Sequence, residues 1–327
     1  MHYNFYVVRT SYLETIIIAL DNLNADTDKL LTNVGLSRRH IANPNNLMLE
    51  LPAWVLLENA AAELAISNLG AIIGMQFCEA FFKSTDNVKK QFPLIEDALK
   101  YFIDQENEIT NGPSFWLKED TDHIWLCRTG TPGINIGVWQ MEQYVVSFLI
   151  GLLKHYLGAN WQPKQIKLKL ADKNLLNNAF GENNCKFEFA NRYTAIAIEK
   201  RFINKVSTHT LSKIEGNSKQ RIPKKPNLLI SKLLEQNYFG ANPNAESISD
   251  CCLINLRKLQ RILHRCDSDL TTLLEQDKKN KAQQLVLETA KPIAEISAIL
   301  GYNDKANFTR AFKRWFKVPP TTYRKTH

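Results

Sequence analysis

Apolar residues recur at helical spacing in the first part of the chain. Within residues 1–70, apolar side chains stand three or four positions apart, which is typical of a buried helix face. Pro52 opens another helical stretch, since proline fits the first turn of a helix. We therefore expect residues 1–70 to be helical, with a further helix around Phe102. The apolar positions are Leu13, Ile16, Ile17 and Leu20, then Leu30, Leu31 and Val34, and later Leu94, Ala98, Leu99 and Phe102.

Further along the chain the spacing changes to that of strands. Several segments are rich in aromatic and branched side chains or alternate apolar with polar positions, which indicates half-buried strands. Residues 119–122 suit a hairpin loop, and a long apolar helix is predicted over 139–157. The pattern predicts an α+β unit over residues 1–203 with a small antiparallel sheet. The expected strands cover 114–118, 123–128, 166–170, 187–189 and 193–198.

Residues 204–227 interrupt this pattern. They are polar and basic, and they contain few large apolar side chains, so we expect a linker. The remaining segment, residues 228–327, shows only helical spacing broken by short turns. The chain is therefore predicted to have an α+β domain, a linker and an all-α domain.

The clearest motif lies in residues 291–324. Gly301 falls where a helix end needs a positive φ angle, and Asn303 or Asp304 is suited to cap the next helix. Pro319 and Pro320 end that second helix. Two helices joined by so short a turn, the second one basic, predict a helix-turn-helix that reads DNA. The buried faces consist of Ile293, Ile296, Ile299 and Leu300, then Phe308, Phe312, Trp315 and Phe316.

A second, weaker motif of the same kind comes before it. A short helix over 248–252 and a turn at 253–255 lead into a helix over 256–263, whose apolar face holds Leu256, Leu259 and Leu263. One long helix over 270–290 is expected to join the two motifs. Two recognition helices on one body can enter successive major grooves if they stand about 34 Å apart.

Charge separates the two predicted domains. The 327 residues carry a net charge of +8, but residues 219–327 hold 20 Lys and Arg against 10 Asp and Glu. This +10 segment suits a polyanionic partner, whereas residues 1–218 carry −2. With 44% hydrophobic residues, the composition excludes a disordered or collagen-like chain.

The ends and the cysteines point to a protein of the cytoplasm. No signal peptide and no membrane-spanning segment is predicted, because the longest apolar run near the start is only residues 16–20. The six cysteines contain no C-x-x-C spacing, so reduced thiols are expected rather than disulfides or a metal site. No cofactor is expected.

Residues 293–324 resemble the AraC/XylS family of bacterial transcription regulators. The similarity lies in IAEISAILGYNDKANFTRAFKRWFKVPP followed two residues later by Tyr323-Arg324. Four positions depart from the family: Leu253 and Lys317 replace glycines, Asn255 replaces a serine, and Lys278 replaces an arginine. The resemblance implies a sequence-specific regulator of a promoter operator, more often an activator, that contacts RNA polymerase. It also implies base contacts at Arg257, Gln260, Arg261, Lys305, Ala306, Asn307 and Arg310, whereas Lys313 is either a phosphate contact or a surface charge.

The first 200 residues resemble, more loosely, the "arabinose-binding" regulatory domain found in ornithine-regulator-like members. The cues are Leu51-Pro52 opening a helix, Phe180-Gly181, and the segment 187–193. This resemblance implies a homodimer and a small-molecule effector, such as an amino acid or another small metabolite.

Residues of the effector pocket are predicted only by type. Aromatic side chains at Trp116, Trp125, Trp139 and Tyr144 are candidates, although aromatic strand residues more often belong to a core. An inward Arg128 would pair with an effector carboxylate, whereas an outward Arg128, the commoner case, would be a surface charge.

Two other classes of function are weaker interpretations. An architectural protein would bind DNA without sequence preference, but two distinct reading helices and a large first domain argue against it. An enzyme is a distant third, because the chain has no G-x-S-x-G, phosphate-binding loop or H-E-x-x-H motif.

Overall fold

The computed structural model describes residues 5–85, 89–90, 94–169, 185–203, 211–212 and 222–327. Contacts divide the chain into two compact units, Met1–Ile222 and Pro223–His327. Most of the expected linker, 204–227, lies outside the described residues, and its last two residues already belong to a helix that begins at Pro226. Phe180-Gly181 also lies outside them.

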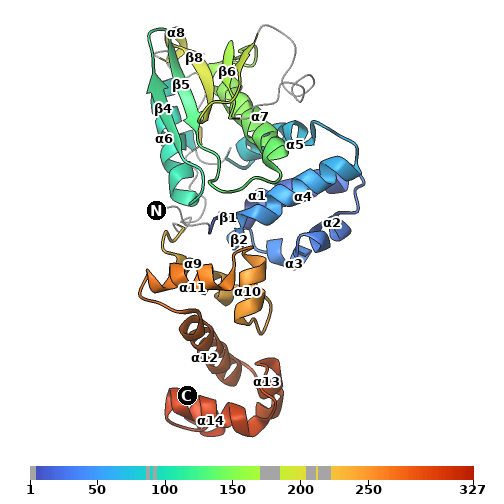
Figure 1. Ribbon diagram of the computed structural model, residues 1–327, viewed down its shortest axis with the longest axis vertical. Coiled ribbons are helices and arrows are strands. Elements are labelled where there is room, and N and C mark those ends of the chain that lie inside the picture. Colours follow the sequence, from blue (N-terminus) through green and yellow to red (C-terminus); the bar gives the residue numbers. More distant parts are fainter. Residues whose placement is uncertain (1–4, 86–88, 91–93, 170–184, 204–210, 213–221) are drawn as a thin grey trace. The chain divides into compact units, whose positions relative to one another are not determined.

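The first unit combines eight described helices with nine described short strands (Figure 1). The α+β class, the helix predicted over 139–157 and the hairpin at 119–122 are confirmed. The helices are α1 (Thr10–Asn22), α2 (Thr27–Asn33), α3 (Arg38–Ile41), α4 (Glu50–Glu63), α5 (Leu69–Thr85), α6 (Ile95–Ile109), α7 (Val138–Leu157) and α8 (Lys200–Ile203). The strands are β1 (Val7–Arg9), β2 (Leu47–Leu49), β3 (Lys89–Lys90), β4 (Phe115–Glu119), β5 (His123–Arg128), β6 (Gln165–Lys167), β7 (Lys186–Glu188), β8 (Thr194–Glu199) and β9 (Leu211–Ser212).

The main sheet has the strand order β4-β5-β8-β6-β7. Its pairs are antiparallel except for β6 and β7, which are parallel, so the expected all-antiparallel sheet is wrong at this edge. The chain between Lys167 and Lys186 is long enough for the crossover that parallel strands require.

A separate antiparallel pair, β1 with β2, corrects the expectation that residues 1–70 are wholly helical. Each of these strands has three residues, too few to show an alternating pattern in the sequence. Asn111 extends this pair, because its side-chain amide accepts from the N–H of Val7 at 2.8 Å and donates to the carbonyl of Phe5 at 3.0 Å. The loop after α6 is thereby tied to β1.

Helices α5 and α7 approach each other closely because small residues form the contact. A Cβ atom on Gly70 would overlap the backbone of Gln140, and one on Gly74 would overlap the backbone of Tyr144. The Gln140 side chain also accepts from the N–H of Gly70 at 2.8 Å, where α5 begins. This crossing fixes where the aromatic side chains of both helices lie.

The second unit consists of seven helices, and the structure describes every residue from 222 to 327. The long helix α12 packs against α9 and against the last three helices, while α11 packs against α9 and α10. Two helix-turn-helix motifs joined by one helix are therefore confirmed. The helices are α9 (Pro226–Glu235), α10 (Ala245–Cys251), α11 (Leu256–His264), α12 (Leu270–Glu288), α13 (Ile293–Ile299), α14 (Lys305–Phe316) and α15 (Pro320–Thr326).

Candidate DNA interface and effector cavity

The second helix-turn-helix is formed by α13 and α14. Gly301 has a φ of +74° in the turn, as the sequence predicts, and Asp304 caps α14 by accepting from the N–H of Asn307 at 2.6 Å. Phe308 and Phe312 of α14 are fully buried against α12 and α13. This packing leaves the opposite face of α14 exposed in a fixed orientation.

The predicted DNA contacts of α14 lie on that exposed face. Lys305, Ala306, Arg310 and Lys313 are all exposed, whereas Asn307 is half-buried. Both ends of the Asn307 amide are engaged, since its nitrogen donates to Asp304 at 2.8 Å and its oxygen accepts from Arg310 at 2.5 Å. Asn307 therefore holds the Arg310 guanidinium in place.

The first helix-turn-helix, α10 and α11, has the same construction with different residues. Leu253 takes the turn position with a φ of +50°, and Asn255 caps α11 by accepting from the N–H of Arg257 at 2.9 Å. The asparagine thus does the capping work expected of serine. Arg257, Gln260 and Arg261 are exposed.

Neither α11 nor α14 contains an acidic residue. Within residues 222–327, Arg257, Arg261, Lys305 and Lys313 form no ion pair. Arg314 differs, because it pairs with Glu275 of α12 at 2.5 Å. The two helices therefore present unpaired positive charge that suits phosphate contacts.

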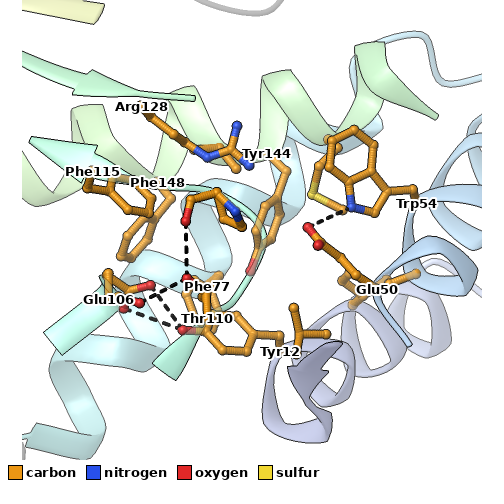
Figure 2. A pocket seen from close by; sticks show the side chains of 16 residues that line it. Tyr12, Glu50, Trp54, Phe77, Glu106, Thr110, Phe115, Arg128, Tyr144 and Phe148 are labelled. Atoms are coloured by element: carbon orange, nitrogen blue, oxygen red, sulfur yellow. Dashed lines mark hydrogen bonds between the residues drawn. The ribbon is translucent and has the colours of Figure 1, made fainter. Parts of the chain in front are cut away.

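A cavity of about 90 Å³ lies inside the first unit (Figure 2). One water molecule needs about 10–15 Å³ on this measure, so the space holds a small organic molecule. Figure 2 shows mostly aromatic and apolar side chains around a few polar groups. The lining residues are Val8, Tyr12, Ile16, Glu50, Ala53, Trp54, Phe77, Glu106, Thr110, Pro113, Phe115, Arg128, Met141, Tyr144, Val145 and Phe148.

Arg128 lies at the end of β5 and lines this cavity, with only 3% of the residue exposed. The outward orientation favoured from the sequence is wrong. Phe115, its Cα partner on β4, lies on the same sheet face and also lines the cavity. Its ion-pair partner is Glu142 of α7, whose Oε2 lies 3.8 Å from the guanidinium.

Glu50 lines the same cavity from the first turn of α4 and is 5% exposed. Its Oε1 accepts from the Thr131 hydroxyl at 2.7 Å and from the Trp54 indole at 3.1 Å. Burial raises the pKa of the Glu50 carboxyl, while Thr131, Arg128 and Trp54 act in the opposite direction.

The opposite wall carries Tyr12, Glu106 and Tyr144. The Tyr12 hydroxyl donates to Glu106 at 3.1 Å, and burial raises the pKa of both tyrosines. The Tyr144 hydroxyl is buried and has no hydrogen-bond partner within the described residues. A buried hydroxyl without a hydrogen-bond partner is costly, and a ligand can supply that partner.

Three aromatic candidates do not line the cavity. Trp116 and Trp125 lie on the other sheet face, because side chains alternate along β4 and β5, and they pack with Cys127. The Trp125 indole donates to Asp120 at 2.6 Å. Trp139 lies in the first turn of α7 and is absent from the lining. Only Arg128 and Tyr144 of the predicted set come together here.

Glu50, Trp54 and Glu106 also line the cavity but were not predicted from the sequence. Glu50 directly precedes the Leu51-Pro52 pair in the first turn of α4. An acidic residue is common at the start of a helix, so its presence there does not indicate a binding site. Trp54 follows at i+4, a spacing that indicates contact between the two side chains. That spacing is the one sequence feature that links two of the missed residues.

Comparison with known proteins locates the similarity in the second unit. Residues 249–326 match the family model of a helix-turn-helix domain. The chain is 37% identical over 68 residues to the ornithine utilization regulator of Pseudomonas aeruginosa, which is 21% of this chain and 20% of that protein. It is 26% identical over 98 residues to the transcriptional activator NphR of a Rhodococcus species, 30% of this chain and 29% of that protein. The chain thus spans less than a third of the length of either curated relative.

One solved structure aligns over most of the chain. The transcriptional regulator CdpR from Pseudomonas aeruginosa covers 82% of this chain and 91% of its own, at 13% identity and a TM-score of 0.35. Among the described residues, no helix is both long and apolar enough to cross a membrane.

Proposed function

We propose that the chain is a member of the AraC family, which its second unit resembles, and that the whole protein is a sequence-specific regulator of transcription. The observation that carries the proposal is the pair of exposed recognition helices, α11 and α14, which are basic and free of acidic residues. Each belongs to its own helix-turn-helix, and α12 joins the two motifs. Such a body can read two successive major grooves.

Residue roles follow from the chemistry of base edges. Arg257, Arg261 and Arg310 suit the paired acceptors of guanine, and Gln260 suits adenine. Ala306 offers a methyl group to thymine. Lys305 and Lys313 contact phosphates, and Asn307 acts mainly by positioning Arg310 through their mutual hydrogen bond.

The test is selection of DNA fragments by the full chain at two salt concentrations. A few fragments that survive the higher salt and share two short boxes about one helical turn apart support the proposal. If all fragments bind with the same affinity and dissociate at the same salt concentration, binding rests on phosphate contacts alone. The proposal is then wrong, and the protein is an architectural one.

Variants separate base contacts from phosphate contacts. Arg261→Ala and Arg310→Ala each lower affinity for the selected site by about 1–3 kcal/mol and broaden the base preference. Lys313→Ala weakens binding to all DNA sequences alike. It also reduces by about one the slope of the logarithm of the binding constant against the logarithm of the salt concentration. Lys232→Ala of α9 is the charge-matched control, since its ion pair with Glu235 at 3.2 Å already balances it.

We propose further that the first unit binds a small-molecule effector in its cavity and that the protein acts as a homodimer. The buried cavity supports the effector, and an effector alters regulation only if it binds the DNA-competent arrangement with a different affinity. The family resemblance supports dimerisation and contact with RNA polymerase. Activation is the proposed direction, since one relative, NphR, is a transcriptional activator.

A further inference from the structure

Two groups of opposite charge in the cavity each have one buried polar atom without a hydrogen-bond partner. The Nε of Arg128 and the Oε2 of Glu50 are buried, and neither has a hydrogen-bond partner within the described residues. Both residues are more than nine-tenths buried, and both line the same space. Figure 2 shows them reaching it from different elements, β5 and α4.

Neighbouring residues compensate these groups only in part. Glu142 approaches Arg128 at 3.8 Å, which is longer than a hydrogen bond. Glu142 also accepts from the Thr194 hydroxyl, so its position is already fixed by a second partner. Thr131 and Trp54 both donate to the other oxygen of Glu50 and leave Oε2 unmatched. A buried polar group without its hydrogen bond is costly, more so when it is charged.

We infer that the cavity binds a small zwitterion, an α-amino acid, with its carboxylate on Arg128 and its ammonium on Glu50. This inference rests on the proposal that the first unit binds an effector, and it names the chemical class. The carboxylate accepts from the Arg128 guanidinium, and the ammonium donates to Oε2 of Glu50. The Tyr144 hydroxyl, which lines the same cavity, is a further partner.

A ligand with one charge satisfies the cavity less well. A carboxylate alone would leave Glu50 unmatched and add negative charge beside Glu50 and Glu106. An amine alone would leave the Nε of Arg128 buried without a partner. A zwitterion supplies both missing groups and adds no net charge to a buried space.

The rest of the cavity selects the side chain of the ligand. Trp54, Phe77, Phe115 and Phe148 form its walls, and such surfaces favour an apolar group. The volume of about 90 Å³ favours a small or medium amino acid over a peptide.

The first experiment measures binding to the purified full chain without DNA. The twenty standard L-amino acids are screened by thermal shift, and the tightest is titrated by calorimetry beside its decarboxylated and deaminated counterparts. For L-leucine these are 3-methylbutylamine and 4-methylpentanoate. We expect the amino acid to bind about tenfold to a hundredfold more tightly than either counterpart, as loss of one charged hydrogen bond requires.

Variants assign the two ends of the ligand. Glu50→Gln weakens binding of the amino acid and the amine about tenfold or more but does not weaken binding of the carboxylate, because it removes a negative charge beside that ligand. Arg128→Met does the reverse, and Arg128→Lys restores part of the loss. Glu63→Gln, exposed at the end of α4 and paired with Lys29 at 3.2 Å, is the matched control and changes nothing.

The outcomes are distinct. If no amino acid binds, or if the amine or the carboxylate binds as tightly as the amino acid, the inference is overturned. Comparison of ligands on the unaltered chain decides this even if a variant does not fold. Because DNA is absent, failure here leaves the DNA selection result intact, and failure of that selection leaves the binding result intact.

Discussion

Leu253 in the turn of the first helix-turn-helix is expected to store backbone strain. Its φ is +50°, a left-handed conformation that glycine adopts freely and other residues adopt at a cost. The side chain is 68% exposed, so it contributes little burial in return. Leu253→Gly should therefore stabilise the second unit.

The magnitude follows from two opposing terms. Relief of the left-handed conformation gains about 1–2 kcal/mol. The greater freedom of glycine in the unfolded chain costs about 0.5–1 kcal/mol. The net gain is about 0.5–1 kcal/mol, or a rise in Tm of a few degrees for a unit of this size.

The assay is thermal unfolding followed by circular dichroism, with Leu253→Ala as the matched control. Alanine removes the exposed side chain but keeps the Cβ atom and its strain, so its Tm should stay near that of the unaltered chain. If glycine proves no more stable than alanine, strain at this turn is not significant and the reasoning is refuted.

Two further predictions concern the backbone at Lys317 and the buried carboxyl of Glu50. Lys317 follows the last turn of α14 with a φ of +69°, so Lys317→Gly should also raise Tm. Its gain in Tm should add to that of Leu253→Gly. An unchanged Tm in thermal unfolding would count against this prediction. Burial raises the pKa of Glu50, so the unliganded fold binds this proton more tightly than the unfolded chain does, and its stabilising contribution falls as pH rises through the raised pKa. Ligand affinity should change in the opposite sense and weaken as pH falls through that pKa, because protonation removes the carboxylate that holds the ammonium. Arg128 and Tyr6 are the other titratable groups whose charge acts on Glu50, and Glu50→Gln should remove the part of the pH dependence in calorimetry that this carboxyl contributes.

The second unit was predictable because local signals agree along its length. Caps at Asn255 and Asp304, the positive φ at Gly301 and the apolar stripe that contains Phe308 and Phe312 are all determined by residues a few positions apart. The resemblance to a known family rests on the same segment. Even the departures at Leu253 and Lys317 keep the backbone conformation that glycine would adopt.

The cavity could not be predicted in the same way because its residues meet only through tertiary packing. Helix α5 has small residues, Gly70 and Gly74, on the face that meets α7, so the usual apolar periodicity does not reveal that contact. The orientation of Arg128 depends on which sheet face is covered, and a single strand does not show this. Alternation does explain afterwards why Trp116 and Trp125 lie away from Phe115 and Arg128.

If both proposals hold, the two sites must influence each other equally. An effector that raises affinity for the selected DNA by some factor must itself bind more tightly by the same factor when that DNA is present. A tenfold effect corresponds to about 1.4 kcal/mol, which one charged hydrogen bond in the cavity, worth about 1.5–3 kcal/mol, can supply. We therefore expect that titrating the amino acid into the protein–DNA complex and titrating the DNA into the protein–ligand complex yield one coupling factor. Arg128→Met and Glu50→Gln should reduce that factor while leaving DNA affinity without ligand unchanged. Unequal factors, or coupling that survives both variants, would mean that the cavity is not the site through which DNA binding is regulated.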